Sequence, residues 1–218
     1  MGGIPIPSLT LIEGPNDAGK SVLSQQTAFG ALTMGLGVRY ITTENTFGTL
    51  VKQMDSLSFT VYKKVLNGRF RITELHTQGI PWNSDMASIY LSTAAQFIGD
   101  CQKEKLIIID SLTSIVTQAA PDSIVRFFSE MRDAVDKKNK CVAITLHPYA
   151  FPPDLLTRIR SMCDGHFVLS IKEIRGKVVR TLEVAKLRGA TMRSAGLVTF
   201  DVDPAFGIRI TPLTSAKG

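Results

Sequence analysis

Residues Gly14–Ser21 read GPNDAGKS, and this stretch decides the fold. It matches the pattern G-x-x-x-x-G-K-[ST] at every required position. An apolar run, Leu9–Glu13, precedes it, and a helical stretch, Gly19–Met34, follows it. The pattern requires this strand–loop–helix setting. The sequence therefore predicts a phosphate-binding loop whose nucleotide contacts come from Gly14, Pro15, Asn16, Asp17, Ala18, Gly19, Lys20, Ser21 and Val22.

The residue types in this loop suit ATP with magnesium. Glycines let the backbone approach the phosphates, and the N–H groups at the start of the helix bind the anion. We expect Lys20 to place its positive charge on the outer phosphates and the Ser21 hydroxyl to ligate Mg²⁺. Asp17 adds a negative charge to the loop. Because aspartate tolerates left-handed backbone, we expect a steric role for Asp17, with its side chain pointing away from the nucleotide.

A second acidic position ends a buried strand. Leu106–Asp110 reads LIIID, a continuous apolar run that is typical of a parallel strand covered on both faces. Asp110 fits the Walker B role of holding Mg²⁺ through water; a helix cap is the structural alternative. The next residue is Ser111, whereas many AAA+ and ABC-type ATPases carry their water-activating glutamate there. Those two classes are therefore disfavoured.

The candidate base lies after another strand. Val38–Thr43 reads as a strand, and Glu44 follows it. The carboxyl ends of parallel strands share one crevice, so Glu44 is predicted to face the γ-phosphate and polarise a water. The alternative is an exposed glutamate that caps a helix beginning near Thr46. Thr145 and His147 end a further strand at the same crevice, where either one senses the γ-phosphate or is structural.

Strands and helices alternate through most of the chain, and the last part changes character. Glycine-rich turns join four late strands at 167–171, 178–186, 197–202 and 208–211. Alternation followed by hairpins predicts an α/β fold of the RecA-like P-loop NTPase type. Its mainly parallel sheet is flanked by helices and extended by antiparallel C-terminal strands. No linker, repeat or low-complexity tract interrupts the 218 residues, so we expect a single domain over 1–218.

Composition limits the environment and the partners. The chain is 44% hydrophobic and 20% charged, which suits one domain with a substantial core. We find no apolar span of transmembrane length and no signal peptide, so we expect a cytoplasmic protein without membrane insertion. The net charge of +6 is interpreted as a solvated basic surface, and nucleic acid is disfavoured because no basic run carries stacking aromatics. We expect reduced, buried thiols without metal-ligand spacing at Cys101, Cys141 and Cys163.

These motifs give the chain a resemblance to the RecA superfamily and, within it, to the KaiC-like ATPases. The resemblance covers nearly the whole chain. It rests on the phosphate loop together with Gly2–Pro5, Tyr40–Glu44, Ile107–Ser111 and Lys186–Gly189. The wording of Leu11–Leu23 and Gln53–Leu57 is similar to the FlaH (ArlH) family, the ATP-binding subunits of the archaellum, the archaeal flagellum.

The resemblance implies two further properties. In related hexameric rings, a K-x-R pair on a late strand reaches the γ-phosphate of the neighbouring subunit, so Lys186 and Arg188 are predicted to act in trans. KaiC-like proteins typically carry two adjacent acidic residues where this chain has Glu44 and Asn45. Asn45 cannot act as a base. We therefore expect weak hydrolysis of ATP, which leaves open whether the chain is an enzyme in its own right.

The favoured function is an ATP- and Mg²⁺-binding regulatory or assembly subunit of the archaellum motor. Hydrolysis is expected to be slow or partner-dependent. The resemblance implies a hexameric ring and two partners: the motor ATPase FlaI and the membrane protein FlaJ. The alternatives are a RecA-type ATPase acting on DNA and a KaiC-like signalling ATPase. The segment Thr113–Ala120 is nearly chargeless, which argues against DNA, and the apolar Pro148–Pro153 is expected to dock protein.

Overall fold

A computed structural model describes residues 3–75, 79, 82–174, 176–189 and 196–211. Met1 and Gly2, the second of which belongs to the quoted Gly2–Pro5 stretch, lie outside these residues. The described strands form one sheet with the order β3-β2-β4-β5-β1-β6-β7-β8-β9. Their bounds are β1 (Ser8–Glu13), β2 (Val38–Thr42), β3 (Phe70–Glu74), β4 (Leu106–Asp110), β5 (Cys141–Leu146), β6 (Gly165–Ile174), β7 (Lys177–Leu187), β8 (Leu197–Asp203) and β9 (Gly207–Thr211).

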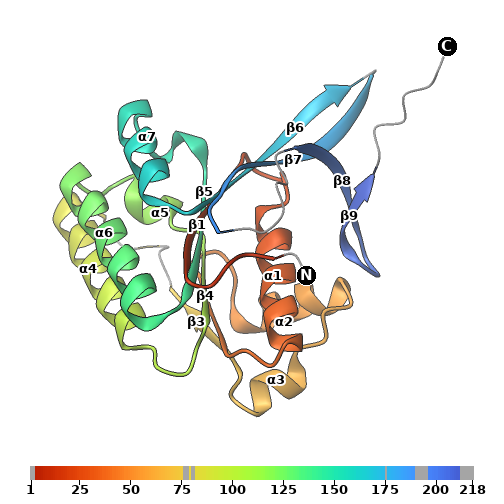
Figure 1. Ribbon diagram of the computed structural model, residues 1–218, viewed down its shortest axis with the longest axis horizontal. Coiled ribbons are helices and arrows are strands. Elements are labelled where there is room, and N and C mark those ends of the chain that lie inside the picture. Colours follow the sequence, from red (N-terminus) through yellow and green to blue (C-terminus); the bar gives the residue numbers. More distant parts are fainter. Residues whose placement is uncertain (1–2, 76–78, 80–81, 175, 190–195, 212–218) are drawn as a thin grey trace.

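The sheet has a parallel half and an antiparallel half. From β3 to β6 all pairings are parallel, and β7, β8 and β9 continue the sheet in antiparallel hairpins. The β6–β7 hairpin extends away from the layered body (Figure 1). The predicted α/β fold with antiparallel C-terminal strands is thus confirmed. The late strands begin earlier or end later than expected, since β6 runs from Gly165 to Ile174 rather than over 167–171.

Helices cover both faces of the parallel half. Side chains of a strand point alternately to its two faces, and β4 shows this directly: Ile107 and Ile109 join one buried cluster, Leu106 and Ile108 the other. The two sets of helices lie on opposite sides of the sheet (Figure 1). The first cluster packs under α4 (Ser84–Asp100), α5 (Thr113–Val116), α6 (Pro121–Lys138) and α7 (Pro153–Met162). The second packs under α1 (Lys20–Thr33), α2 (Phe47–Ser56) and the start of α3 (Tyr62–Leu66).

The antiparallel half supports the phosphate loop from one side. A Cβ at Gly14 would stand 2.8 Å from the Leu169 carbonyl oxygen of β6, closer than real Cβ contacts allow. Gly19 has a φ of +97°, a conformation that favours glycine, and its added Cβ would meet the Phe200 ring at 3.2 Å. Both glycines therefore let the late strands pack directly against the loop.

The apolar loop after β5 is partly exposed, and the expectation that it docks protein stays a prediction. In Pro148–Pro153 the three prolines and Tyr149 are exposed, whereas Ala150 and Phe151 are buried and Phe151 packs edge-on against Phe128 of α6. This loop begins with a short 3₁₀ turn, η1 (Pro148–Ala150). Tyr149 alone among its large side chains stays exposed. The segment after β4 includes α5, in which Ile115 and Val116 are buried.

Candidate nucleotide site

One cavity of about 640 Å³ lies at the carboxyl end of the parallel strands, beside the start of α1. Of the predicted site residues, it brings together Asn16, Asp17, Gly19, Lys20, Ser21, Val22, Glu44 and Asp110. The other predicted loop residues, Gly14, Pro15 and Ala18, do not line the cavity and support the residues that do. Ala18 and Gly14 are buried, and the carbonyls of Gly14 and Pro15 accept hydrogen bonds from Lys20. The residues chosen from sequence therefore converge on one space of suitable size.

Lys20 is folded back onto the loop that carries it. Its Nζ lies 2.8 Å from the carbonyl oxygens of both Gly14 and Pro15. Burial lowers the pKa of Lys20, and the charges of Asp110, Glu44 and Asp17 oppose that shift. The ammonium group is thus buried and ready to exchange two carbonyl contacts for phosphate oxygens, which are stronger partners because they are charged.

Asp17 has the left-handed backbone that its residue type suggested, with φ 58°. The expected outward position is not observed, because Asp17 lines the cavity and its charge raises the pKa of Lys20. Its carbonyl accepts a hydrogen bond of 2.9 Å from Arg180 Nε. The structure therefore gives Asp17 a second role as an anchor for a residue of β7.

Asp110 is almost fully buried at the end of β4 and is held by three hydroxyls. Tyr40 donates to Oδ2 at 2.6 Å, and Thr145 and Ser21 donate to Oδ1 at 2.8 and 3.3 Å. Burial raises the pKa of Asp110, and the hydrogen bonds from Tyr40 and Thr145 work against that rise. Thr145 is therefore a buried support of the carboxylate and does not line the cavity, which favours a structural role over contact with the γ-phosphate.

The oxygens of Ser21 and Asp110 fit a magnesium ion. Ser21 Oγ and Asp110 Oδ1 are 3.3 Å apart, so an ion bound by the Ser21 hydroxyl would lie within reach of Asp110 through one of its water ligands. Among the described residues there is no group of three or more His, Cys, Asp or Glu that could hold a metal alone. An ion at this position would take its other ligands from phosphate and water, as Mg²⁺ usually does.

Glu44 lies beside Asp110 and does not cap the next helix. The hydroxyl of Ser111 donates to Glu44 Oε1 at 3.0 Å, while α2 is capped by Thr46, whose Oγ1 accepts from the Thr49 amide. The helix-cap alternative for Glu44 is therefore wrong. In the strand order, β4 and β5 lie between β2 and β1. Glu44 still reaches the cavity, since the ends of β2 and β4 are adjacent, with Thr42 opposite Asp110.

Asn45 belongs to a chain of amides beside the cavity. Gln53 Nε2 of α2 donates to Asn45 Oδ1 at 3.1 Å, and Gln25 Nε2 of α1 donates to Gln53 Oε1 at 3.2 Å. The side chain that replaces a second acid thus ties the β2–α2 loop to two helices. The Asn45 side chain therefore holds the loop next to Glu44 in place and brings no charge to the site.

His147 lines the cavity, and burial followed by the charge of Lys20 lowers its pKa. The imidazole is therefore neutral at physiological pH. Its Nδ1 lies 3.1 Å from the Tyr149 hydroxyl, which orients the ring. His147 is consequently positioned to contact a phosphate as a neutral hydrogen-bonding group.

Two lining residues were missed by sequence reasoning. Arg180 of β7 and Val202 of β8 complete the cavity wall on the side of the antiparallel strands. No motif marks either residue. Only the register of the hairpins places them here, with Arg180 opposite Ile171 on β6 and opposite Phe200 on β8.

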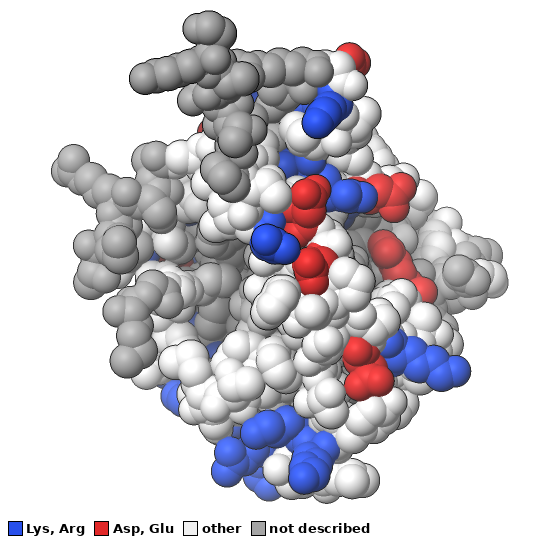
Figure 2. Space-filling view, turned by 90° about the vertical axis from the view of Figure 1, so that its right-hand side faces the viewer, with Lys and Arg blue, Asp and Glu red and all other residues white. Residues whose placement is uncertain are grey.

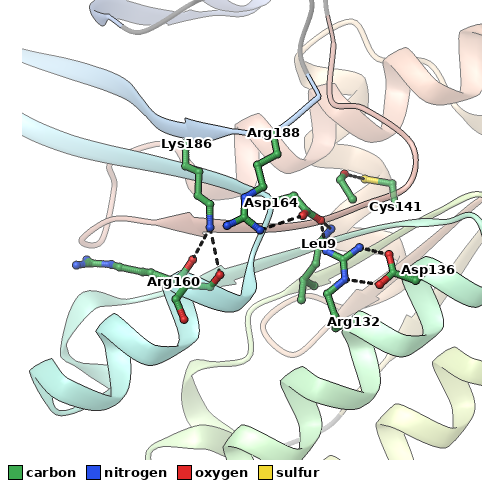
Figure 3. A network of polar contacts seen from close by, with 10 residues as sticks. Leu9, Arg132, Asp136, Cys141, Arg160, Asp164, Lys186 and Arg188 are labelled. Atoms are coloured by element: carbon green, nitrogen blue, oxygen red, sulfur yellow. Dashed lines mark hydrogen bonds and ion pairs between the residues drawn. The ribbon is translucent and has the colours of Figure 1, made fainter.

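Lys186 and Arg188 lie away from their own cavity. Gly165 of β6 is opposite Thr10 of β1 on one side and Leu187 of β7 on the other. Lys186 and Arg188, which flank Leu187, therefore lie near the first residues of β1. Lys186 Nζ donates to the carbonyls of Arg160 and Ser161 in the last turn of α7, at 3.2 Å each (Figure 3). Arg188 Nη1 lies 4.0 Å from Asp164. The pair does not line the cavity, which is the geometry that a role in trans requires.

Comparisons with known proteins agree with this geometry. The model of the KaiC ATPase family matches residues 1–215. The archaeal flagellar ATP-binding protein FlaH of Sulfolobus acidocaldarius is 32% identical over 217 residues, which covers 100% of this chain and 94% of that protein. FlaH of Methanococcus voltae is 26% identical over 215 residues, covering 96% and 90%.

Solved structures show the same relationship. The crystal structure of the flagellar accessory protein FlaH from Methanocaldococcus jannaschii has a TM-score of 0.83 at 25% identity, covering 96% of this chain and 92% of that one. A KaiC-like protein from Pyrococcus horikoshii, at 21% identity and a TM-score of 0.73, shares the fold. The phosphate loop in its strand–helix setting and the full-length match to the family model together show that this chain belongs to the KaiC family of ATPases.

Proposed function

We propose that this protein is an ATP- and Mg²⁺-binding subunit of the archaellum motor, acting as one domain over residues 1–218. Its nucleotide state would regulate assembly. The observation that carries the proposal is the pairing of Ser21 with buried Asp110 next to Lys20, in a chain that is similar over its full length to FlaH. In this site Lys20 and the N–H groups of α1 hold the phosphates. Ser21 and Asp110 hold the ion, which neutralises phosphate charge.

Hydrolysis by a single subunit is proposed to be slow. Glu44 lies in the cavity and can polarise a water, but its neighbour Asn45 is an amide engaged with Gln53. The cations that would stabilise the transferring phosphoryl group, Lys186 and Arg188, contact their own subunit outside the cavity. Charges of this kind accelerate phosphoryl transfer only when they reach it.

Assembly would supply these cations from a neighbour. Lys186 is held by two backbone carbonyls and Arg188 by one long ion pair, so both can be released at low cost to a phosphate. A ring closed in this way, hexameric by analogy with related ATPases, would present a nucleotide-dependent surface to the motor ATPase FlaI and the membrane protein FlaJ. The protein would then work in the cytoplasm at the base of the motor. No helix among the described residues is long and apolar enough to cross a membrane.

A DNA-handling RecA role receives less support. The segments after β4 and β5, where such a protein needs basic or aromatic loops, contain no Lys or Arg in 111–120 and 147–153. Ile115 and Phe151 are buried there, and Tyr149 is the one exposed aromatic side chain of these described segments. A KaiC-like signalling role would use the same nucleotide site and would differ in its partner.

Light scattering with Mg·ATP, Mg·ADP and no nucleotide tests the proposal. We expect a larger mass, or capture of FlaI from solution, with ATP only, and turnover far below the usual range of about 1–10³ per second. Glu44→Gln should lower the remaining rate and leave binding intact, because it removes the base and keeps the side-chain shape. The same mass in all three states, with partner capture indifferent to nucleotide, would contradict a switch. Fast turnover by a monomer would contradict the need for a neighbour.

A further inference from the structure

The end of the molecule opposite the cavity gathers basic side chains from loops that are distant in sequence. In the register of the parallel strands, Val38 is opposite both Phe70 and Leu106, and Leu106 is opposite Cys141. The loops before β3, β2, β4 and β5 therefore lie side by side. Backbone hydrogen bonds join them, from the Val38 amide to the Arg69 carbonyl at 2.8 Å and from the Lys105 amide to the Gly37 carbonyl at 2.9 Å.

We define the basic edge by Lys63, Lys64, Arg69, Lys103, Lys105 and Lys138. All are exposed except Lys64, which is half-buried. In the described residues no acidic side chain pairs with any of them; the acidic group within these loops, Glu104, is buried and paired with Arg39 and Arg71. Figure 2 shows Lys and Arg side chains gathered at the lower end of the molecule, the end where α3 lies in Figure 1, with no Asp or Glu among them.

Exposed aliphatic side chains stand among these cations. Leu66, in the last turn of α3, is 87% exposed, and Met34, after α1, is 74% exposed. Met34 precedes Gly35, whose added Cβ would lie 3.6 Å from Arg69 Nη1, so the apolar and basic groups share one surface. Lysines around protruding aliphatic groups suit a bilayer interface, where charge meets the headgroups and the aliphatic tips enter beneath them.

We propose that the basic edge is a docking surface for an anionic phospholipid bilayer. A nucleic acid would be expected to use several aromatic or arginine platforms for stacking. Here the two most exposed apolar groups, Leu66 and Met34, are aliphatic, Tyr62 is the one half-exposed aromatic on α3, and five of the six cations are lysines. The nucleotide cavity lies at the opposite ends of the same strands, so membrane and ATP can be bound together. The inference rests on the charge and exposure of this edge and does not require the proposed function.

Co-sedimentation with vesicles tests the proposal on the full chain. We expect binding to vesicles of phosphatidylcholine mixed with phosphatidylglycerol, no binding to phosphatidylcholine alone, and weakening of the binding by salt. Each lysine near an anionic surface strengthens binding by roughly fivefold. The double variant Lys63→Ala/Lys64→Ala should therefore bind about 25-fold more weakly.

The matched control removes two lysines from the β6–β7 hairpin, Lys172→Ala/Lys177→Ala, which are exposed and lie away from the basic edge. It changes the net charge equally and should bind like the parent. Leu66→Ser keeps the charge and should weaken binding by up to roughly tenfold, with little dependence on salt. Unchanged thermal unfolding and ATP binding in each variant would show that the fold is intact.

Three results would overturn the proposal. They are equal binding to neutral and anionic vesicles, no binding to either, and equal losses in the two double variants. Retention on duplex DNA that depends on Lys63 and Lys64, without vesicle binding, would reassign the basic edge to nucleic acid.

Discussion

The buried acids of the parallel half, Asp110 and Glu13, are held by side chains of their own chain, whereas the cations of the antiparallel half contact carbonyls or a distant counterion. Asp110 receives three hydroxyl donors. Burial raises the pKa of Glu13 of β1, but hydrogen bonds from Arg160 and the nearby His166, whose Nε2 lies 3.0 Å away, bring it to about 2. In the later strands Arg180 and Lys186 are only half-buried and bond to backbone carbonyls, and Arg188 is exposed. Folding alone thus fixes the part of the site that the parallel strands form. The cations of the antiparallel strands are available to a nucleotide or a neighbouring subunit.

The largest expected effect lies in the parallel half. Lys20→Ala leaves the outer phosphates without their buried cation. Two charge-assisted contacts of roughly 1.5–3 kcal/mol each should be lost, which weakens ATP binding by a hundredfold or more. Calorimetry measures this loss, and Lys52→Ala, exposed on α2, is the matched control. Unchanged affinity in Lys20→Ala would remove the assignment of the site.

The next effect tests the antiparallel half. Lys186→Ala/Arg188→Ala should abolish the difference in assembly between ATP and ADP. We expect that difference to be about tenfold or more, because the gain from two contacts to phosphate is reduced by the loss of the contacts that both side chains make in the free subunit. Affinity for ATP within one subunit should be unchanged, because neither residue lines its own cavity. Lys177→Ala/Arg209→Ala removes two exposed cations from β7 and β9 as a control for charge. A loss of affinity without a loss of assembly would place the pair in cis.

Arg180 should show an intermediate behaviour because it belongs to the antiparallel half and lines the cavity in its own chain. Arg180→Ala removes one hydrogen bond to the Asp17 carbonyl and one cation from the wall. A half-exposed contact of about 1 kcal/mol corresponds to a roughly fivefold loss of ATP affinity. Arg209→Ala is the control for calorimetry, and equal affinities in the two variants would show that Arg180 serves only the loop.

The smallest expected effect concerns stability. The pKa of Asp110 is raised in the folded chain, chiefly by burial. The unfolded chain therefore loses this proton at lower pH, and ionisation costs stability as the pH rises through the raised pKa. Asp110→Asn should unfold at a higher temperature than the parent at neutral pH without ligands, by a few degrees, since about 1 kcal/mol shifts the midpoint by 2–4 °C at this size.

Mg·ATP should reverse that order, because the parent alone keeps the carboxylate for the ion. Scanning fluorimetry at acidic and neutral pH, with and without Mg·ATP, measures both differences. At a pH where Asp110 is protonated in both states, the parent and Asp110→Asn should unfold together. A parent that is more stable than the variant without ligand would show that the three hydroxyls outweigh the cost of burial.

Local sequence was sufficient to predict the part of the site formed by the phosphate loop and the parallel strands. Gly14–Ser21 specifies its own loop, and Asp110 and Glu44 directly follow apolar runs whose carboxyl ends meet in any parallel sheet. Their convergence on one cavity needed no knowledge of strand order. The antiparallel extension was also predictable, because glycine turns separate its strands.

Strand order and register decided what the sequence could not. They placed Arg180 and Val202 in the cavity wall, turned Thr145 onto Asp110, buried Phe151 under α6 and aligned four basic loops along one edge. Each of these outcomes joins residues from segments far apart in the chain. The energy of such contacts depends on which strands are neighbours and in what register, and a residue's own neighbours in sequence carry no information about either.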